Sequence, residues 1–264
     1  MRNFWRMAWL SYKGLYITWQ GQAYIFRVFL TPVLWVLIIS LFGKFAANPR
    51  LAESYIVGMS IFSVPFVITD GILGSFSTER TYGTLSHLFV SPVNRLKIFL
   101  SRGAIHWANG IVTLAASLAA AWAILGLDFS EVNWVSAFCS ILALAVASIG
   151  FALLLGNVAV ASGRGGYTFQ FAYGIVLILS GVVIPTSSLP PLLYEISQII
   201  PVTNGLAAAR ASVAGAGLAE VGGLILAELL VGITYALVGA VLFRLVEARA
   251  KRLGNLDQVG EGGM

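Results

Sequence analysis

Residues 77–99 read STERTYGTLSHLFVSPVNRLKIF, a charged stretch with long apolar sequence on both sides. Ser77 is a residue type that commonly caps the start of a helix. Glu79 would then lie in the first turn, where a negative charge is favourable. Apolar side chains then recur on one face at helical spacing, and a proline follows the expected helix end. The stretch predicts a short amphipathic helix in a polar loop between two membrane spans, either an ordinary interfacial loop or a docking element for a soluble partner. The apolar face consists of Tyr82, Leu85 and Phe89, and the proline is Pro92.

The composition places most of the chain in a lipid bilayer. Of its 264 residues, 58% are hydrophobic and only 10% are charged, with a mean hydropathy of +0.88. A soluble domain carries about 25% charged residues. Apolar runs long enough to cross the hydrocarbon core as helices recur along the chain, whereas a barrel would need short alternating segments. The sequence therefore predicts an all-α polytopic membrane protein.

The apolar runs predict six transmembrane helices within a single transmembrane domain, residues 1–264. Residues 1–22 carry aromatic side chains at steps of four and three, with basic residues beside this stripe. Such a helix suits the headgroup boundary, so we expect an N-terminal interfacial amphipathic helix in the membrane plane. The expected spans are residues 24–42, 54–74, 98–125, 133–160, 167–184 and 221–243, followed by a cytoplasmic tail of residues 244–264.

The basic residues predict the orientation of the chain. With both termini in the cytoplasm, 13 of the 16 lysines and arginines lie on the inner face, leaving Lys44, Arg50 and Arg210 outside. This bias follows the positive-inside rule and places residues 77–92 in the cytoplasm.

Small residues recur every four positions in two of the expected spans. Such ridges let helices approach closely in lipid, within one chain or across a dimer. The ridges are Gly232, Ala236 and Ala240, and Ala115, Ala119 and Ala123.

Residues 180–210 read SGVVIPTSSLPPLLYEISQIIPVTNGLAAAR, an apolar helix that prolines interrupt. Irregular backbone at membrane depth is tolerated only where protein or a water-filled cavity covers it. We therefore expect an outer re-entrant helical hairpin over residues 185–210, between the fifth and sixth spans, and consider it a candidate outer gate. Its prolines are Pro185, Pro190, Pro191 and Pro201.

Two motifs, one in residues 79–93 and one ending at Arg210, resemble those of ABC type-2 transporter permeases, and the resemblance covers nearly the whole chain. In that family the cytoplasmic loop before the third span contacts the ATP-binding subunit. The resemblance therefore implies that residues 77–92 form a coupling segment with a cytoplasmic coupling helix. The motifs are Glu79-Arg80, Gly83-Thr84-Leu85 and Ser91-Pro92-Val93, then Pro185, Leu189-Pro190, Pro201 and Arg210, and the residues implied in coupling are Glu79, Arg80, Gly83, Thr84, Leu85 and Leu88.

The resemblance also implies partners. A six-span chain is half of the usual transport unit, so two permease subunits, identical or different, pair and dock two ATP-binding subunits. None of the four lysines follows a glycine-rich run and precedes Ser or Thr, so this chain has no phosphate-binding loop of its own. We expect ATP and Mg²⁺ on the partner subunit and no cofactor on this chain. The family implies export across a bacterial inner (plasma) membrane, and the basic residues at span ends indicate orientation rather than nucleic-acid binding.

No set of side chains predicts catalysis, so we do not expect an enzyme. His87 and His106 have no Cys or carboxylate at ligand spacing, so no metal site is expected either. Ionisable residues within spans usually face protein or water. We therefore interpret Asp70 either as a solvated interfacial residue or as a functional one. Glu228 is interpreted either as an interhelical hydrogen-bond partner or as a subunit contact.

Few charges and many aromatic residues in the spans favour an amphiphile, a lipid or a hydrophobic drug as substrate. A lipid-linked polysaccharide competes within the same family, because its exporters also combine a six-span half with an interfacial N-terminal helix. From other classes, an ATP-independent secondary transporter would show inverted repeats, which are not evident, and a membrane enzyme would need a polar catalytic cluster. The aromatic residues considered for a substrate path, although such residues are more often core or lipid-facing, are Phe62, Phe66, Phe169 and Phe171.

Overall fold

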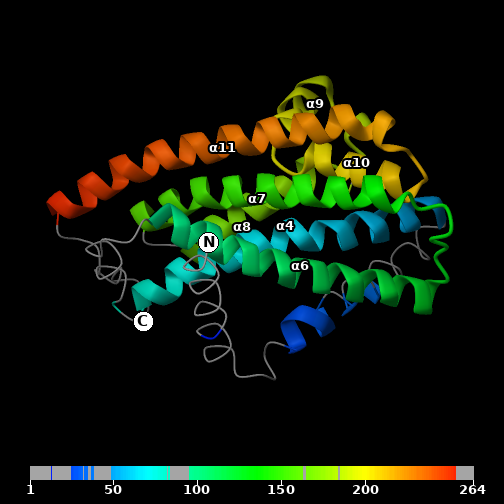
Figure 1. Ribbon diagram of the computed structural model, residues 1–264, viewed down its shortest axis with the longest axis horizontal. Helices are drawn as coiled ribbons and strands as arrows, with labels where there is room; N and C mark the ends of the chain where they lie inside the picture. Colours follow the sequence, from blue (N-terminus) through cyan, green and yellow to red (C-terminus); the bar gives the residue numbers. More distant parts are fainter. Residues whose placement is uncertain are drawn as a thin grey trace.

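The computed structural model describes residues 13, 25–31, 33–34, 37–38, 49–81, 83, 95–162, 165–183 and 185–253. Every regular element within them is helical (Figure 1), which confirms the all-α fold class for this part of the chain. The long helices are α4 (Pro49–Thr81), α6 (Arg95–Leu125), α7 (Trp134–Ser162) and α11 (Leu218–Leu253), and the shorter elements are the π-helical turn η1 (Phe26–Leu30), α8 (Gly165–Leu179), the 3-10 turn η2 (Thr186–Ser188), α9 (Pro191–Gln198) and α10 (Thr203–Val213).

Four of the described helices are long and apolar enough to cross a membrane, so the chain is a multi-pass membrane protein. They correspond to the expected second, third, fourth and sixth spans. Apart from Lys13, the expected interfacial helix, residues 1–22, lies outside the described residues, and the expected first span, residues 24–42, is described only at 25–31, 33–34 and 37–38, so the count of six spans stays a prediction. The four apolar segments are Ser54–Ser75, Ser101–Ala123, Trp134–Ala159 and Leu218–Leu245.

α8 ends earlier than the expected fifth span, residues 167–184. The Ser180 N–H donates to the Val176 carbonyl at 2.9 Å, and Gly181 then adopts a φ of 81°. Glycine reaches this left-handed region at little cost and commonly follows the end of a helix. With 15 residues, α8 is roughly 22 Å long, shorter than the hydrocarbon core of about 30 Å. The expected span is therefore wrong in its C-terminal part, because the helix stops at Leu179.

α4 extends beyond the expected second span and continues through Ser77 to Thr81. The prediction that Ser77 caps a new helix is therefore wrong, and the coupling segment begins as the C-terminal end of α4. The reason is that no proline or left-handed residue interrupts the helix here, and Gly74 alone costs only about 1 kcal/mol relative to alanine. Gly83, with a φ of 65°, follows the helix end.

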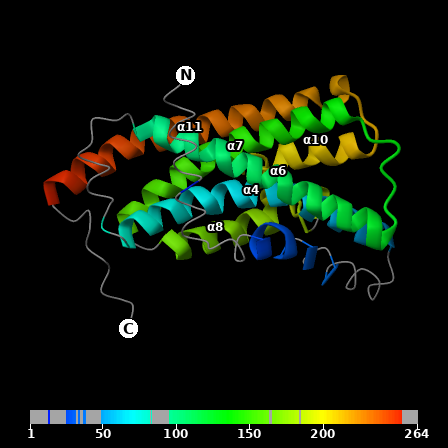
Figure 2. The ribbon, with the colours of Figure 1, turned by 60° about the horizontal axis from the view of Figure 1, so that its bottom comes forward.

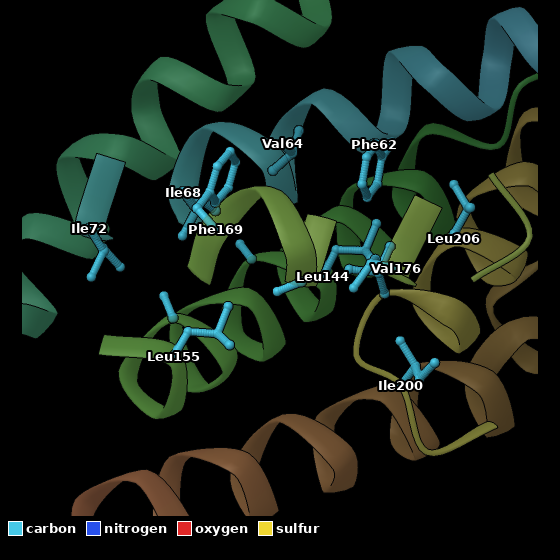
Figure 3. Close-up of a cluster of buried hydrophobic side chains, with 14 of the residues drawn as sticks. Phe62, Val64, Ile68, Ile72, Leu144, Leu155, Phe169, Val176, Ile200 and Leu206 are labelled. Atoms are coloured by element: carbon cyan, nitrogen blue, oxygen red, sulfur yellow. The ribbon is translucent and has the colours of Figure 1, made fainter. Parts of the chain in front are cut away.

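The long helices are stacked in the order α11, α7, α4 and α6 across the bundle (Figure 1). α7 is central, because it contacts α11, α4, α10 and α8. α4 and α8 run side by side (Figure 2), and α10 lies against α7 and α11. The buried core lies where α4, α7, α8 and α10 meet (Figure 3), and it includes Ile68, Leu144, Val176 and Leu206.

Small residues allow α7 and α11 to pack closely. A Cβ on Gly232 would lie 2.4 Å from the Cα of Ala147, and one on Gly150 would lie 2.3 Å from the carbonyl oxygen of Gly232. The amide nitrogen Nδ2 of Asn157 donates to the Gly239 carbonyl at 2.9 Å in the same interface. The predicted ridge of small residues on α11 therefore serves packing within one chain.

Other helical surfaces stay exposed in the described part of the chain. Only 17% of the apolar α11 segment and 33% of the apolar α6 segment is buried, and such apolar surface suits contact with lipid or with another helix. The second predicted ridge belongs to this uncovered surface of α6, and its exposed residues are Ala115, Ala119 and Ala123.

The two ends of the bundle differ in chemistry. Trp122 and Trp134 flank the loop that joins α6 to α7 and are 65% and 67% exposed, as indole rings at a membrane boundary are. We call this the tryptophan end. In the same loop, the Ser130 backbone N–H and hydroxyl donate to Asp128 and hold the pKa of that carboxyl below its ordinary value. At the other end, which we call the coupling end, α4 ends and α6 begins.

The close contact between α7 and α11 predicts that Gly232→Ala lowers the free energy of unfolding by about 1–3 kcal/mol, because the added methyl group forces the two backbones apart. Thermal unfolding in detergent, followed by size-exclusion chromatography, measures the change. The matched control is Gly223→Ala on the same helix, where a Cβ meets nothing within 4 Å and alanine is the better helix former. Equal melting temperatures for the two variants would contradict the prediction.

Candidate functional site

An ion pair joins α4 to α6 at the coupling end. The guanidinium Nη2 of Arg102 donates to Oε1 of Glu79, and the two side chains are only 12% and 18% exposed. A hydrogen bond between charged groups is about twice as strong as a neutral one. The pair therefore holds together the two helices that flank the rest of the coupling segment.

The structure places only part of the predicted coupling residues. Glu79 and Arg80 lie in α4, and Gly83 is exposed beyond the helix end. Sequence reasoning missed Arg102, although opposite charges on consecutive antiparallel helices are a readable signal for such a pair. The remaining predicted coupling residues, which lie outside the described part of the chain, are Thr84, Leu85 and Leu88.

A small apolar cavity of about 20 Å³ lies between α4, α7 and α8. Aromatic rings form one side of it. The ring centroid of Phe66 lies 4.8 Å from that of Tyr173 and 5.3 Å from that of Phe169. The centroids of Phe62 and Tyr173 are 5.4 Å apart. These rings present apolar faces and edges, so the cavity suits an apolar group.

Three of the four aromatic residues considered for a substrate path line this cavity: Phe62, Phe66 and Phe169. Phe171 is 74% exposed on the other face of α8 and does not line it. Sequence reasoning missed Tyr173, although it follows Phe169 by one helical turn and so shares its face.

α11 supplies a buried carboxylate to the start of α10. Glu228 has 0% exposure, and its two oxygens accept hydrogen bonds from the Val202 N–H at 2.7 Å and the Gly205 N–H at 2.9 Å. The first N–H groups of a helix have no partner within the helix and favour an anion. Of the two roles expected for Glu228, the structure therefore shows the interhelical hydrogen-bond partner.

This cap lies deep in the bundle. Glu228 follows Leu218 by ten residues on α11, and Leu144 follows Trp134 by ten residues on α7. At 1.5 Å per residue, both are roughly 15 Å from the tryptophan end, about half the thickness of a hydrocarbon core. A Cβ on Gly205 would lie 2.7 Å from Leu144 and 2.9 Å from Glu228, so glycine permits the approach.

Arg210 holds the other end of α10. Its Nη1 donates to the Gly181 carbonyl, just beyond the end of α8. Its Nη2 donates to the carbonyls of Val182 at 2.9 Å and Ser54 at 3.1 Å. Gly58 on α4 makes room, because a Cβ there would lie 1.8 Å from Nη2. Arg210 therefore connects α10 to α4 and to the chain just after α8.

The prolines of the predicted hairpin stand at the boundaries of its short helices. Pro185 precedes η2 and Pro190 precedes α9. Pro191 is the first residue of α9, a position that needs no N–H donor and suits proline. Pro201 lies in the turn between α9 and α10, and α10 continues past residue 210 to Val213.

The geometry around Arg210 predicts that Arg210→Lys lowers the free energy of unfolding by about 2–4 kcal/mol. An ammonium group cannot reproduce the guanidinium fork, and each lost hydrogen bond to a charged group costs about 1.5–3 kcal/mol. Denaturant titration of the purified chain measures the change. Arg244→Lys, at an exposed position on α11, is the matched control and should be neutral. A lysine variant at position 210 as stable as the wild type would show that the fork is dispensable.

Comparison with known proteins agrees with the sequence motifs. A sequence model of the family described as ABC-2 type transporter matches residues 3–213 of the chain, a region that ends with the last residue of α10. Comparison with curated proteins gives no match. Members of this family are transport subunits that typically work with an ATP-binding subunit. Because the match covers most of the chain, the protein belongs to the ABC-2 type transporter family.

Proposed function

We propose that the chain is the membrane-spanning permease subunit of an ATP-driven exporter. The observation that carries this proposal is the family match over residues 3–213, which includes three of the four apolar spans of the described bundle. The subunit has no ATPase site of its own in this proposal. It moves its substrate out of the cytoplasm or the inner leaflet while a separate subunit hydrolyses ATP.

Coupling runs through α4 and α6. Closure of the two ATP-binding subunits moves the coupling segment, residues 77–92. The ion pair between Glu79 and Arg102 supports this route, because it makes the adjoining ends of α4 and α6 move as one unit. The nucleotide drives the change only if its bound state favours one arrangement over the other.

The assembly contains two permease subunits, identical or different, and two ATP-binding subunits that hold ATP and Mg²⁺. We place it in the bacterial inner (plasma) membrane, with both termini and the coupling end in the cytoplasm and the tryptophan end outside. The positive-inside rule supports this orientation, because basic residues flank the start of α6 at the coupling end. These residues are Arg95, Lys97 and Arg102.

The proposed substrate is amphiphilic, hydrophobic or lipid-linked. The aromatic cavity supports an apolar portion, and the hairpin of residues 185–210, with α10 reaching bilayer mid-depth, supports the role of an outer gate. A lipid-linked polysaccharide is the second candidate, favoured by the aromatic stripe of residues 1–22. An ATP-independent secondary transporter is the alternative outside the family.

A charge exchange between Glu79 and Arg102 tests the coupling route. We expect Glu79→Arg and Arg102→Glu each to reduce co-purification of the ATP-binding subunit and its stimulated ATPase activity about tenfold or more, because leaving a buried charge unpaired costs about 3–5 kcal/mol. The double variant restores the pair and should recover most of both signals. Arg244→Glu, at an exposed site on α11, is the charge-matched control.

The outcomes separate three mechanisms. Recovery in the double variant supports a pair that positions the coupling segment. Loss that the exchange does not repair would instead make Glu79 a direct contact of the ATP-binding subunit. Absence of any such partner, with transport persisting in ATP-free liposomes, would overturn the exporter proposal in favour of secondary transport.

A further inference from the structure

The turn between α9 and α10 holds a residue in a conformation that its side chain disfavours. Val202 has a φ of 92°, a region that β-branched residues rarely adopt. Such a conformation persists only where the surrounding structure imposes it. Here Glu228 accepts the Val202 N–H from outside the turn, at 2.7 Å. The turn, which we call the tip, is therefore restrained by α11.

The restrained residue also lines the aromatic cavity. The side chain of Val202 is 2% exposed and lines the cavity together with Phe62, Phe66 and Tyr173. The backbone N–H of Val202 thus donates to the Glu228 carboxylate, while its side chain lines the same cavity as the aromatic rings. Moving the tip away from α11 would remove one wall of the cavity.

The two ends of α10 are attached to different helices. Arg210 fixes the last turn to the carbonyls of α4 and of the chain after α8. The tip is attached to Glu228 on α11, a helix that packs mainly on α7 and α10. α10 therefore bridges α4 and α8, which carry the aromatic rings, and α11, which carries the carboxylate. A movement of α11 relative to α4 and α8 would strain the hydrogen bonds that hold the tip.

We propose that Glu228 is a latch that holds the tip over the aromatic cavity, and that its release opens the cavity to an apolar chain or ring of the substrate. The latch rests on geometry, whereas its use in transport rests on the proposed function. A carboxylate suits this task because each oxygen accepts one N–H, and Gly205 lets it approach the start of α10.

Thiol labelling of the full-length chain in membranes tests the latch. Cys139 is the single cysteine and is replaced by serine, and Val202→Cys then places a thiol at the tip. With Glu228 present, a small anionic methanethiosulfonate added outside should react slowly. With Glu228→Ala, we expect labelling to accelerate about tenfold or more, because both hydrogen bonds to the carboxylate are lost. The charge-matched control, Glu220→Ala at an exposed site of α11, should leave labelling slow.

A second thiol separates latch release from unfolding. Ala152 in α7 is fully buried. A cysteine introduced there, Ala152→Cys, should stay unreactive when Glu228 is replaced. If Glu228→Ala exposes both thiols, Glu228→Gln decides, because its single carbonyl oxygen can keep one of the two bonds. Selective labelling at position 202 in either variant supports the latch. Slow labelling at position 202 in both, or equal labelling at both positions in Glu228→Gln, overturns it.

The ATP-binding subunit then tests the use of the latch. With Glu228 present, labelling at position 202 should change between nucleotide-free and nucleotide-trapped complexes, and Glu228→Ala should abolish this dependence. If Glu228→Ala speeds labelling but nucleotide has no effect, the latch stands and the proposed ATP-driven function fails.

Discussion

A backbone that leaves the helical hydrogen-bond ladder inside a bilayer needs partners for its polar groups, and the buried Glu228 and the partly buried Arg210 provide them here. Arg210 donates hydrogen bonds to the carbonyls after α8. Glu228 accepts hydrogen bonds from the N–H groups at the start of α10. Each charge is balanced by backbone dipoles rather than by the other charge, since helix starts favour anions and helix ends favour cations. The two side chains therefore satisfy backbone groups on both sides of the break between α8 and α10.

The position of Glu228 depends on the packing of the helix that carries it. Gly150 and Gly232 let α7 and α11 approach at a distance that larger side chains forbid, and Asn157 bonds to the α11 backbone across the contact. Leu144 of α7 also lies close to Gly205 at the start of α10. The close packing that small residues allow between α7 and α11 thus helps to position the Glu228 carboxylate against the start of α10.

α4 connects the three regions on which the proposed function depends. Its 33 residues span roughly 50 Å. They carry the Ser54 carbonyl that binds Arg210 near the tryptophan end and Glu79 at the coupling end. The aromatic cavity lies between them, where Phe66 follows Pro65 inside the helix. A proline within a helix removes one backbone hydrogen bond and is a common site of bending. In the proposed mechanism, α4 is the continuous element through which movement at the coupling end reaches the cavity.

Hydropathy is a local property, so the sequence by itself determined the helical class and the four spans that the structure contains, and its motifs indicated the family. It placed the end of α8 too late and began a helix at Ser77, because helix ends depend on a few backbone angles that hydropathy does not report. The partners of Glu79 and Glu228 lie 23 to 26 residues away along the chain, on other helices. Only the tertiary structure decided these pairs and the place of Val202 in the cavity wall, because both depend on how the helices pack against one another.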